Sequence, residues 1–540
     1  IGYDALQFNT TGSRNNIIGH QAGLYNTTGT DNTGLGFNAL TATTTGATNT
    51  AVGNYSLDAN TTGSLNTAVG YESLTVATTA GENTCLGAAA GRYIGSGANN
   101  TAIGRSALHS TVSGSTGQMT GTHNVAVGQD TLFANTTGSY NTACGNYALI
   151  GTAGGAAITT ASSNTALGAQ AGDSITTGGK NTAVGRTALG GVTTTGEHTA
   201  CGYYALAGNT SGERNTGFGT EAGITNTTGN DNVSVGYKVL NSNIGNANTF
   251  MGSNAGLYMD TGGDNTAMGY EAMRCASGQA ADPNGCVGVG YQALKSILDG
   301  DNNTAIGIYS MQNQASQNSN TAVGRSSMRY STSGDANTAV GKDAGMNVST
   351  GCCNVYIGCE AADETTTGSY NTIVGFNASQ GNTTGSNNVS LGYKAGNTGN
   401  GDNQLHIARS NGGAGSASQW IVGDSNGACV QGNNSSSWNT TSDKRLKKNI
   451  VDNSKGLKEI EQLRVTNFEY RTREEIDMSE FPLASEPLQI VLAQEIETVL
   501  PECITVSSFG AKTVNADPIV WALVNAVKEL SAKIKELETK

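Results

Sequence analysis

The chain has 540 residues with 76 glycines, 28 basic and 41 acidic residues, and a formal net charge of −13. Charged residues make up 13% of the chain, against about 25% in typical soluble domains. The acidic balance disfavours a nucleic-acid partner, which needs a basic face, and no apolar run of about 18 residues predicts membrane insertion.

The first part of the chain is an internal repeat built on the motif Asn-Thr-Ala-Val-Gly. Its closing glycine occurs 23 times between Gly2 and Gly392, and 18 of the 22 spacings are 17 residues. The three longer spacings predict loop insertions over 105–127, 146–167 and 270–289. Because Ile1-Gly2 ends a motif, we expect the parent protein to extend upstream.

Each repeat is too short for a helix and carries an apolar residue directly before the motif glycine. Stacked at about 4.8 Å per strand, 23 such coils would form a ladder roughly 105 Å long, as in a solenoid. We therefore expect a mainly β fold with a parallel β-solenoid shaft over residues 1–396. Val52 and Val69 are expected in its core, while the small residues Ala51, Ala68 and Ala102 are expected to face a partner chain.

Polar residues recur in the same register. Stacked amides could bond along the axis at one position, and Thr-Thr-Gly segments supply a turn in which glycine takes a positive φ. A disordered Gly/Asn/Thr linker is the alternative, but disorder gives no reason to keep a 17-residue register. The expected ladder contains Asn49, Asn66, Asn83, Asn141 and Asn181, and Thr61-Thr62-Gly63 is one such turn.

These repeats resemble the head repeats of trimeric autotransporter adhesins, which are parallel β-rolls in a three-chain bundle. They are also similar to Asn-Thr-Ala-Val-Gly arrays of phage tail fibres. The resemblance covers about residues 1–396 and implies a homotrimer.

Residues 397–441 lose the repeat register and form a separate small β module. Residues 403–407 and 419–423 alternate as strands do, and 431–441 form a polar connector. Composition then changes: 38 of the first 441 residues are charged, against 31 of the last 99. A domain boundary is therefore expected at 441/442.

Directly after this boundary stands Ser442-Asp443-Lys444-Arg445-Leu446-Lys447. A serine nucleophile needs a base, and a lysine with a lowered pKa can serve. On spacing alone, a solvated basic turn explains the same residues.

The Ser-Asp-x-Arg-x-Lys pattern resembles the self-cleaving intramolecular chaperones of endosialidases and phage tail fibres, and a similar domain occurs in the myelin regulatory factor. Further matching parts lie at 456–460, 468–470, 491–496 and 500–502. The resemblance covers 442–540 and implies an α+β chaperone that trimerises and is then cut off. It assigns Ser442 as nucleophile, Lys447 as general base and Thr441–Ser442 as the scissile bond, with Asp443 and Arg445 in supporting roles.

The C-terminal tail carries a heptad pattern of apolar residues with spacings of 3 and 4. It predicts a short coiled coil over about 519–540 that sets a three-fold register, the alternative being a monomeric amphipathic helix. The expected trimer seam is Leu523, Val527, Leu530, Ile534 and Leu537.

The ten cysteines show no metal-ligand spacing, and no metal or cofactor is expected. They are interpreted as reduced core residues, with Cys144 and Cys201 at the apolar ladder position, while Cys275 and Cys286 could bridge around an insertion. The five histidines, at 20, 109, 123, 198 and 406, are expected in packing or on the surface.

The favoured function is a structural virion fibre, a phage tail fibre or receptor-binding protein assembled in the host cytoplasm. Its partners would be a host surface glycan or protein and, through an upstream part, other tail proteins. Its only expected chemistry is self-cleavage. One alternative is a tailspike enzyme, which needs two carboxylates for glycan hydrolysis. The other is a bacterial adhesin, which needs a membrane anchor that 442–540 does not contain.

Overall fold

The computed structural model divides the chain into two compact units, Ile1–Trp438 and Asn439–Lys540. The structure describes residues 1–110, 118–151, 160–192, 194–241, 245–279, 281–313, 316–396, 400–408, 419–423, 429–431, 454–463, 493–506 and 512–540.

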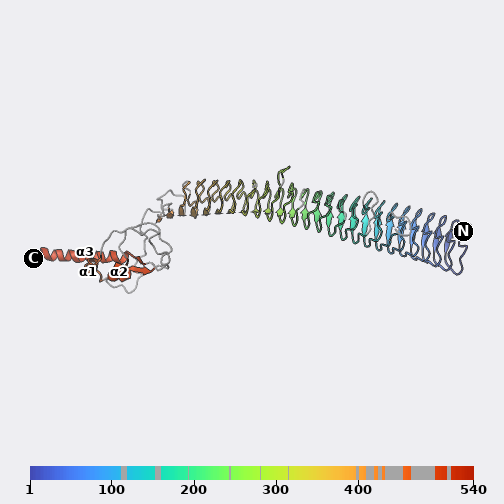
Figure 1. Ribbon diagram of the computed structural model, residues 1–540, viewed down its shortest axis with the longest axis horizontal. Helices are drawn as coiled ribbons and strands as arrows, with labels where there is room; N and C mark the ends of the chain where they lie inside the picture. The colour runs from blue at the N-terminus through green and yellow to red at the C-terminus, as the bar shows by residue number, and fades with distance from the viewer. Residues whose placement is uncertain are drawn as a thin grey trace, which may run out of the picture. The chain divides into compact units, whose positions relative to one another are not determined.

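The first unit contains 22 three-residue strands, one in each coil, that stack along a single elongated body (Figure 1). Neighbouring coils pair in parallel with a one-repeat register, so that Thr50 lies opposite Thr67 and Val52 opposite Val69. This arrangement confirms the predicted parallel β-solenoid. The strands are β1 Asn16–Ile18, β2 Thr33–Leu35, β3 Thr50–Val52, β4 Thr67–Val69, β5 Thr84–Leu86, β6 Thr101–Ile103, β7 Val125–Val127, β8 Thr142–Cys144, β9 Thr165–Leu167, β10 Thr182–Val184, β11 Thr199–Cys201, β12 Thr216–Phe218, β13 Val233–Val235, β14 Thr249–Met251, β15 Thr266–Met268, β16 Val287–Val289, β17 Thr304–Ile306, β18 Thr321–Val323, β19 Thr338–Val340, β20 Val355–Ile357, β21 Thr372–Val374 and β22 Val389–Leu391.

The interior of the solenoid is formed by the central residue of each strand, and not by the residue before the motif glycine. Side chains alternate along a strand, so the centre points inward while both ends point outward. Ala51, Ala68 and Ala102 are fully buried within their own chain, whereas Val69 is 36% exposed. The expectation that alanines face a partner while the valines form the core is therefore wrong.

The space inside each coil is filled by a second apolar residue, four positions after the motif glycine. This residue is leucine in 11 of the 23 coils, as in Leu40, Leu57 and Leu74, which are at most 1% exposed. Where it is glycine, another side chain takes the space: the strand centre Phe250 beside Gly256, and Ile175 beside Gly172. The strand centres and these second residues thus make a thin core that is continuous only because the coils stack.

The predicted asparagine ladder is present and buried. The side-chain oxygen of Asn49 accepts the backbone N–H of Asn66 on the next coil at 3.0 Å. Its amide nitrogen donates to the carbonyl of Gly63 at 2.9 Å. A buried asparagine of this ladder, such as Asn49, therefore satisfies backbone groups of its own coil and of the next one, which water cannot reach.

Glycine is required at two positions of the repeat for different reasons. The motif glycine has a positive φ, +135° at Gly53, and a Cβ there would collide with the backbone of Gly70. The turn glycine Gly63 does not have the positive φ that was expected. It is needed because a Cβ would lie against the carbonyl of Ala80 and the side chain of Asn60.

The predicted strands after the repeats are β23 (Leu405–Ala408) and β24 (Gln419–Gly423). β23 pairs in parallel with β22, and therefore extends the solenoid sheet by one strand. β24 then pairs antiparallel with β23 and with β25 (Cys429–Gln431). The change from parallel to antiparallel pairing ends the repeating pattern.

The second unit is mixed α and β, as predicted. Its elements are α1 (Leu457–Ile460), α2 (Ala493–Val499), the short 3₁₀ helix η2 (Pro501–Cys503), β26 (Ile504–Val506), β27 (Lys512–Val514) and α3 (Asp517–Glu538). β26 and β27 form an antiparallel pair. Ile496, Leu500 and Cys503 are fully buried in the core of the described part of this unit.

Candidate functional site

The predicted cleavage motif lies outside the described residues. This applies to Thr441, Ser442, Asp443, Arg445 and Lys447. Their assigned roles stay predictions, and the structure places only the segment that follows them, which begins at residue 454.

The start of this segment, residues 455–457, is hydrogen-bonded to the long C-terminal helix α3. The side-chain nitrogen of Asn525 donates to the carbonyl oxygen of Lys455 at 2.9 Å, and the backbone N–H of Leu457 donates to the carboxylate of Glu529 at 3.1 Å. Gly456 lies between these contacts, where a Cβ would collide with the Glu529 carboxylate. The start of α1 therefore depends on a helix about 70 residues further along the chain.

Helix α3 has two different faces. Ala522 and Ala526 are buried against its own unit. The predicted seam residues are all exposed in the single chain, and every residue from 531 to 540 is exposed as well. The exposed fractions are 50% for Leu523, 60% for Val527, 47% for Leu530, 48% for Ile534 and 72% for Leu537.

The solenoid also leaves an apolar row uncovered, which we call the apolar stripe: the third residue of each strand from β1 to β22. All 22 positions hold an aliphatic residue, methionine, phenylalanine or cysteine, and none is buried. Cys144 is exposed and Cys201 is half-buried, so their expected place in the core is wrong. Both thiols point outward because the third residue of the strand does.

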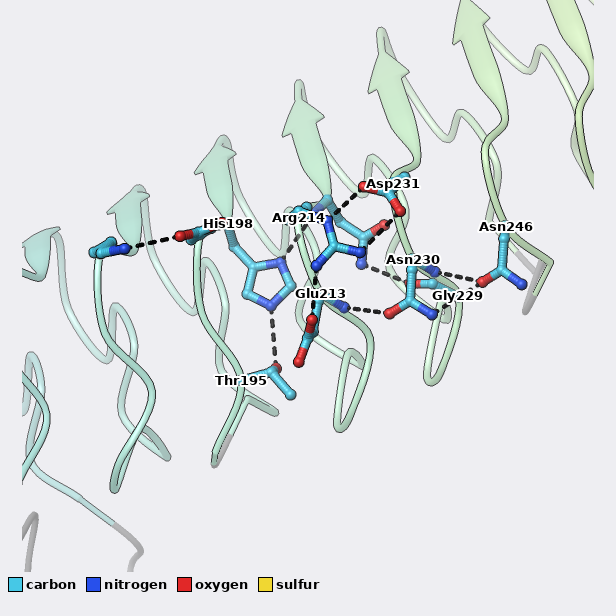
Figure 2. Close-up of polar contacts among 11 residues, drawn as sticks. Thr195, His198, Glu213, Arg214, Gly229, Asn230, Asp231 and Asn246 are labelled. Atoms are coloured by element: carbon cyan, nitrogen blue, oxygen red, sulfur yellow. Dashed lines mark hydrogen bonds and ion pairs between the residues drawn. The ribbon is translucent and has the colours of Figure 1, made fainter.

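The coil of His198 departs from the asparagine ladder (Figure 2). His198 takes the ladder position, donates its backbone N–H to Asn181 at 3.0 Å, and accepts the backbone N–H of Asn215 at Nδ1, 3.1 Å away. Its Nε2 lies 3.1 Å from the hydroxyl of Thr195. The ring is 1% exposed, and this burial lowers its pKa to about 4. The neutral imidazole therefore replaces an asparagine amide.

Outside this coil, charges of alternating sign follow one turn position over four coils. Lys180 pairs with Glu197 at 2.9 Å. Arg214 pairs with Asp231 at 2.7 Å and with its neighbour Glu213 at 2.7 Å (Figure 2). Hydrogen bonds from these cations lower the pKa of Glu197 and of Asp231. Lys180, Glu197, Glu213 and Arg214 line a shallow groove, in which two cations balance two carboxylates.

Cys275 and Cys286 are both free and buried, so the bridge considered between them is absent. Cys286 instead occupies the asparagine ladder, where its sulfur accepts the backbone N–H of Asn303 at 3.4 Å. The ladder roles of His198 and Cys286 were missed in the sequence. Both residues stand at the asparagine position of their repeat, and this register was the signal that could have revealed them.

Within the described ranges, no group of three or more His, Cys, Asp or Glu side chains is arranged to hold a metal ion. None of the helices in the part of the chain that the structure describes is both long and apolar enough to cross a membrane.

Comparison with known families gives one match. Residues 442–505 match the family described as chaperone of endosialidase. The match begins at the predicted nucleophile Ser442 and runs through α1, α2 and η2 into β26. No curated protein and no solved structure matches the chain significantly. The chain thus joins a segment similar to the endosialidase chaperone family to a β-solenoid of 17-residue repeats, a combination that fits a tail fibre with an endosialidase-type chaperone.

Proposed function

We propose that this chain is the subunit of a homotrimeric virion fibre that attaches a phage to its host. Its C-terminal unit would align three chains and then be released by self-cleavage. The observation that carries this proposal is the chaperone match at 442–505, which follows directly on the solenoid and its β module. The fibre would be assembled in the host cytoplasm and joined to other tail proteins.

The proposed cleavage uses only groups of the chain and one water molecule. The hydroxyl oxygen of Ser442 attacks the carbonyl carbon of Thr441 while Lys447 takes up the hydroxyl proton. The C–N bond then breaks, the nitrogen of Ser442 receives that proton, and an ester remains between Thr441 and the Ser442 oxygen. Water hydrolyses this ester, which separates the fibre from the chaperone.

The trimeric state is supported by α3. A single helix that exposes a heptad seam of five large apolar residues has an unsatisfied surface of the kind that coiled coils bury. The seam is short, so the coil would set the register of three chains while the globular unit adds contacts.

Host contact is assigned to the parts that interrupt the repeat. The insertions within 105–127, 146–167 and 270–289 and the module at 397–441 are aperiodic in sequence, whereas the repeats present similar groups from coil to coil. A host surface glycan or protein is the proposed receptor.

The geometry does not favour a glycan-cleaving enzyme in the described part of the solenoid. The groove acid Glu197 is ion-paired with Lys180 and has a lowered pKa, whereas a general acid needs a raised one. Burial raises the pKa to about 6 at Asp58 and at Asp363, and it also raises the pKa of Asp173. None of these three acids lines the groove.

The test is a denaturing gel with intact mass on the full chain beside Ser442→Ala and Lys447→Ala. The parent should give pieces of 441 and 99 residues, and both variants should stay whole. Lys448→Ala is the matched control, because it removes a neighbouring lysine and should leave cleavage intact. A parent chain that stays whole, or a Ser442→Ala chain that is still cut at this bond, would contradict the proposal.

A further inference from the structure

The apolar stripe is as large as the largest apolar patches of monomeric proteins. The third residues of 22 stacked strands form a row roughly 100 Å long, which at a width of about 6 Å amounts to about 600 Å², the upper end of the 300–600 Å² usual for the largest patch on a monomer. Twelve of these side chains are exposed: Cys144 and eleven larger apolar residues, from 36% for Val69 to 54% for Phe218.

The residue after the motif glycine widens this apolar surface in many coils. These side chains are exposed aromatic rings, and several stack on the ring of the next coil, as Tyr270 does on Tyr291 with centroids 5.4 Å apart. Stacked rings present their edges outward and keep their faces for each other. Examples are Tyr3, Phe37, Tyr71, Tyr237, Tyr270, Tyr291, Phe376 and Tyr393.

The outward side of the strands carries no charge. No first or third residue of β1 to β22 is Asp, Glu, Lys or Arg, although the chain has 69 such residues. In a symmetric self-association each residue lies near its own copies, so a charge at these positions would meet the same charge. The uncharged strand positions therefore favour further copies of this chain over an unrelated partner. The position after the motif glycine is not free of charge, because it holds Arg105, Arg186, Arg325 and Lys342 in four coils.

The periodicity of the apolar stripe also favours a second copy of this chain as the partner that covers it. A surface that repeats once per coil over 22 coils is matched along its whole length only by a partner with the same rise. A second copy of the solenoid has that rise by construction, and the exposed seam of α3 shows a second surface suited to self-association.

We infer that the apolar stripe is the surface through which the copies of this chain pack against one another, coil against equivalent coil, along the fibre. This inference rests on the proposed homotrimer and names the residues that would bury its contact. It also implies that the outward thiols of Cys144 and of Cys201 each lie beside the same thiol of the neighbouring copies.

The experiment uses these native thiols. Purified full-length chain, whose native mass is measured first, is treated briefly with a short bifunctional maleimide and run on a denaturing gel. The stripe pair is removed in Cys144→Ser/Cys201→Ser. The matched control Cys352→Ser/Cys353→Ser removes a pair that lies on a turn, where Cys353 is exposed. Covalent dimers and trimers should form in the parent and the control, and should be lost in the stripe variant.

Two results would overturn the inference. In a preparation of trimeric native mass, failure to cross-link through Cys144 or Cys201 would show that the solenoids are held together elsewhere, and the proposed trimer would survive. A monomeric native mass would remove both the proposed trimer and this contact. The two failures are thereby distinguished.

Discussion

The two units of this chain achieve order in opposite ways. In the solenoid, nearly every contact joins residues one repeat apart, as in the 17-residue step from Asn49 to Asn66. In the C-terminal unit, the contacts of Asn525 and Glu529 with α1 span about 70 residues and occur once. Repetition supplies a long rod whose coils are joined by regular backbone hydrogen bonds, and the aperiodic unit supplies contacts that occur only once.

This difference explains why one chain would need both. Coils this similar can pair with a neighbouring chain one repeat out of register at little cost per contact. Register must therefore be set from one end, by a unit that fits in one way only. If that unit is then cut off, the fibre loses its folding template. The lifetime of the folded fibre is then set by its rate of unfolding.

The largest expected effect is the loss of stability when a charge is placed inside the solenoid. Two adjacent residues, one pointing inward and one outward, allow this loss to be compared. Ala68→Asp places a carboxylate in the core and should cost about 3 kcal/mol or more, which disrupts the surrounding coils. Val69→Asp alters an outward position and should change coil stability by only about 1 kcal/mol while it blocks the contact along the stripe. Hydrogen exchange of β3 to β5 measures the stability of the coils, and native mass measures the association along the stripe. Equal loss of protection in both variants would refute the assignment of inside and outside.

The next effect concerns the motif glycine. Gly53→Ala combines a φ of +135° with a collision against the backbone of Gly70, and should cost about 2–4 kcal/mol. Gly278→Ala is the control, because its φ is also positive, +82°, but its Cβ would meet nothing within 4 Å. Gly278→Ala should lower the stability by about 1–2 kcal/mol, because it introduces backbone strain without a collision. Local hydrogen exchange around each site reports the difference, and similar costs would show that packing between coils is not what requires glycine.

The smallest expected effect is a loss of stability at acidic pH in the coil of His198, which is irregular within the regular solenoid. Burial lowers the pKa of His198 from 6.5 to about 4, so folding favours the neutral ring. The contribution of the neutral ring to the free energy of unfolding is complete above pH 6.5. It is lost as the pH falls toward 4, and the loss is about 3 kcal/mol at most. Protonation at Nδ1 would also set a donor against the N–H of Asn215. Glu213, the only acid that acts noticeably on the ring, opposes the shift weakly.

The measurement is hydrogen exchange of residues 199–215 at pH 7.5 and 4.5, with His198→Asn as control. Asparagine restores the ladder residue and does not titrate, so protection in this variant should fall less on acidification than in the parent. An equal fall in both chains would exclude His198 as its cause.

The fold was largely predictable from the sequence because its signal is periodic. A 17-residue spacing repeated 18 times determines strand position, parallel pairing and the stacking of Asn49 on Asn66. The direction of the side chains was not predictable from the same signal. Ala68 and Val69 are both compatible with a buried position, and only the backbone path at the following glycine decides that the smaller residue points inward.

The candidate site was predictable only as far as its motif. Ser442 and Lys447 rest on a pattern that the family match supports at 442–505, while their geometry lies outside the described residues. The anchoring of Leu457 by Glu529 could not be predicted, because it joins distant segments that share no sequence signal. The heptad spacing did predict a long helix here, and α3 occupies Asp517–Glu538, while the role of its apolar residues as a trimer seam stays a prediction.

The native mass of the purified product tests the central claim most directly. If the C-terminal unit aligns three chains and is then removed, the mass should equal three copies of residues 1–441, with the 99-residue piece released. A mass equal to one uncut chain of 540 residues would contradict both the assembly and the cleavage.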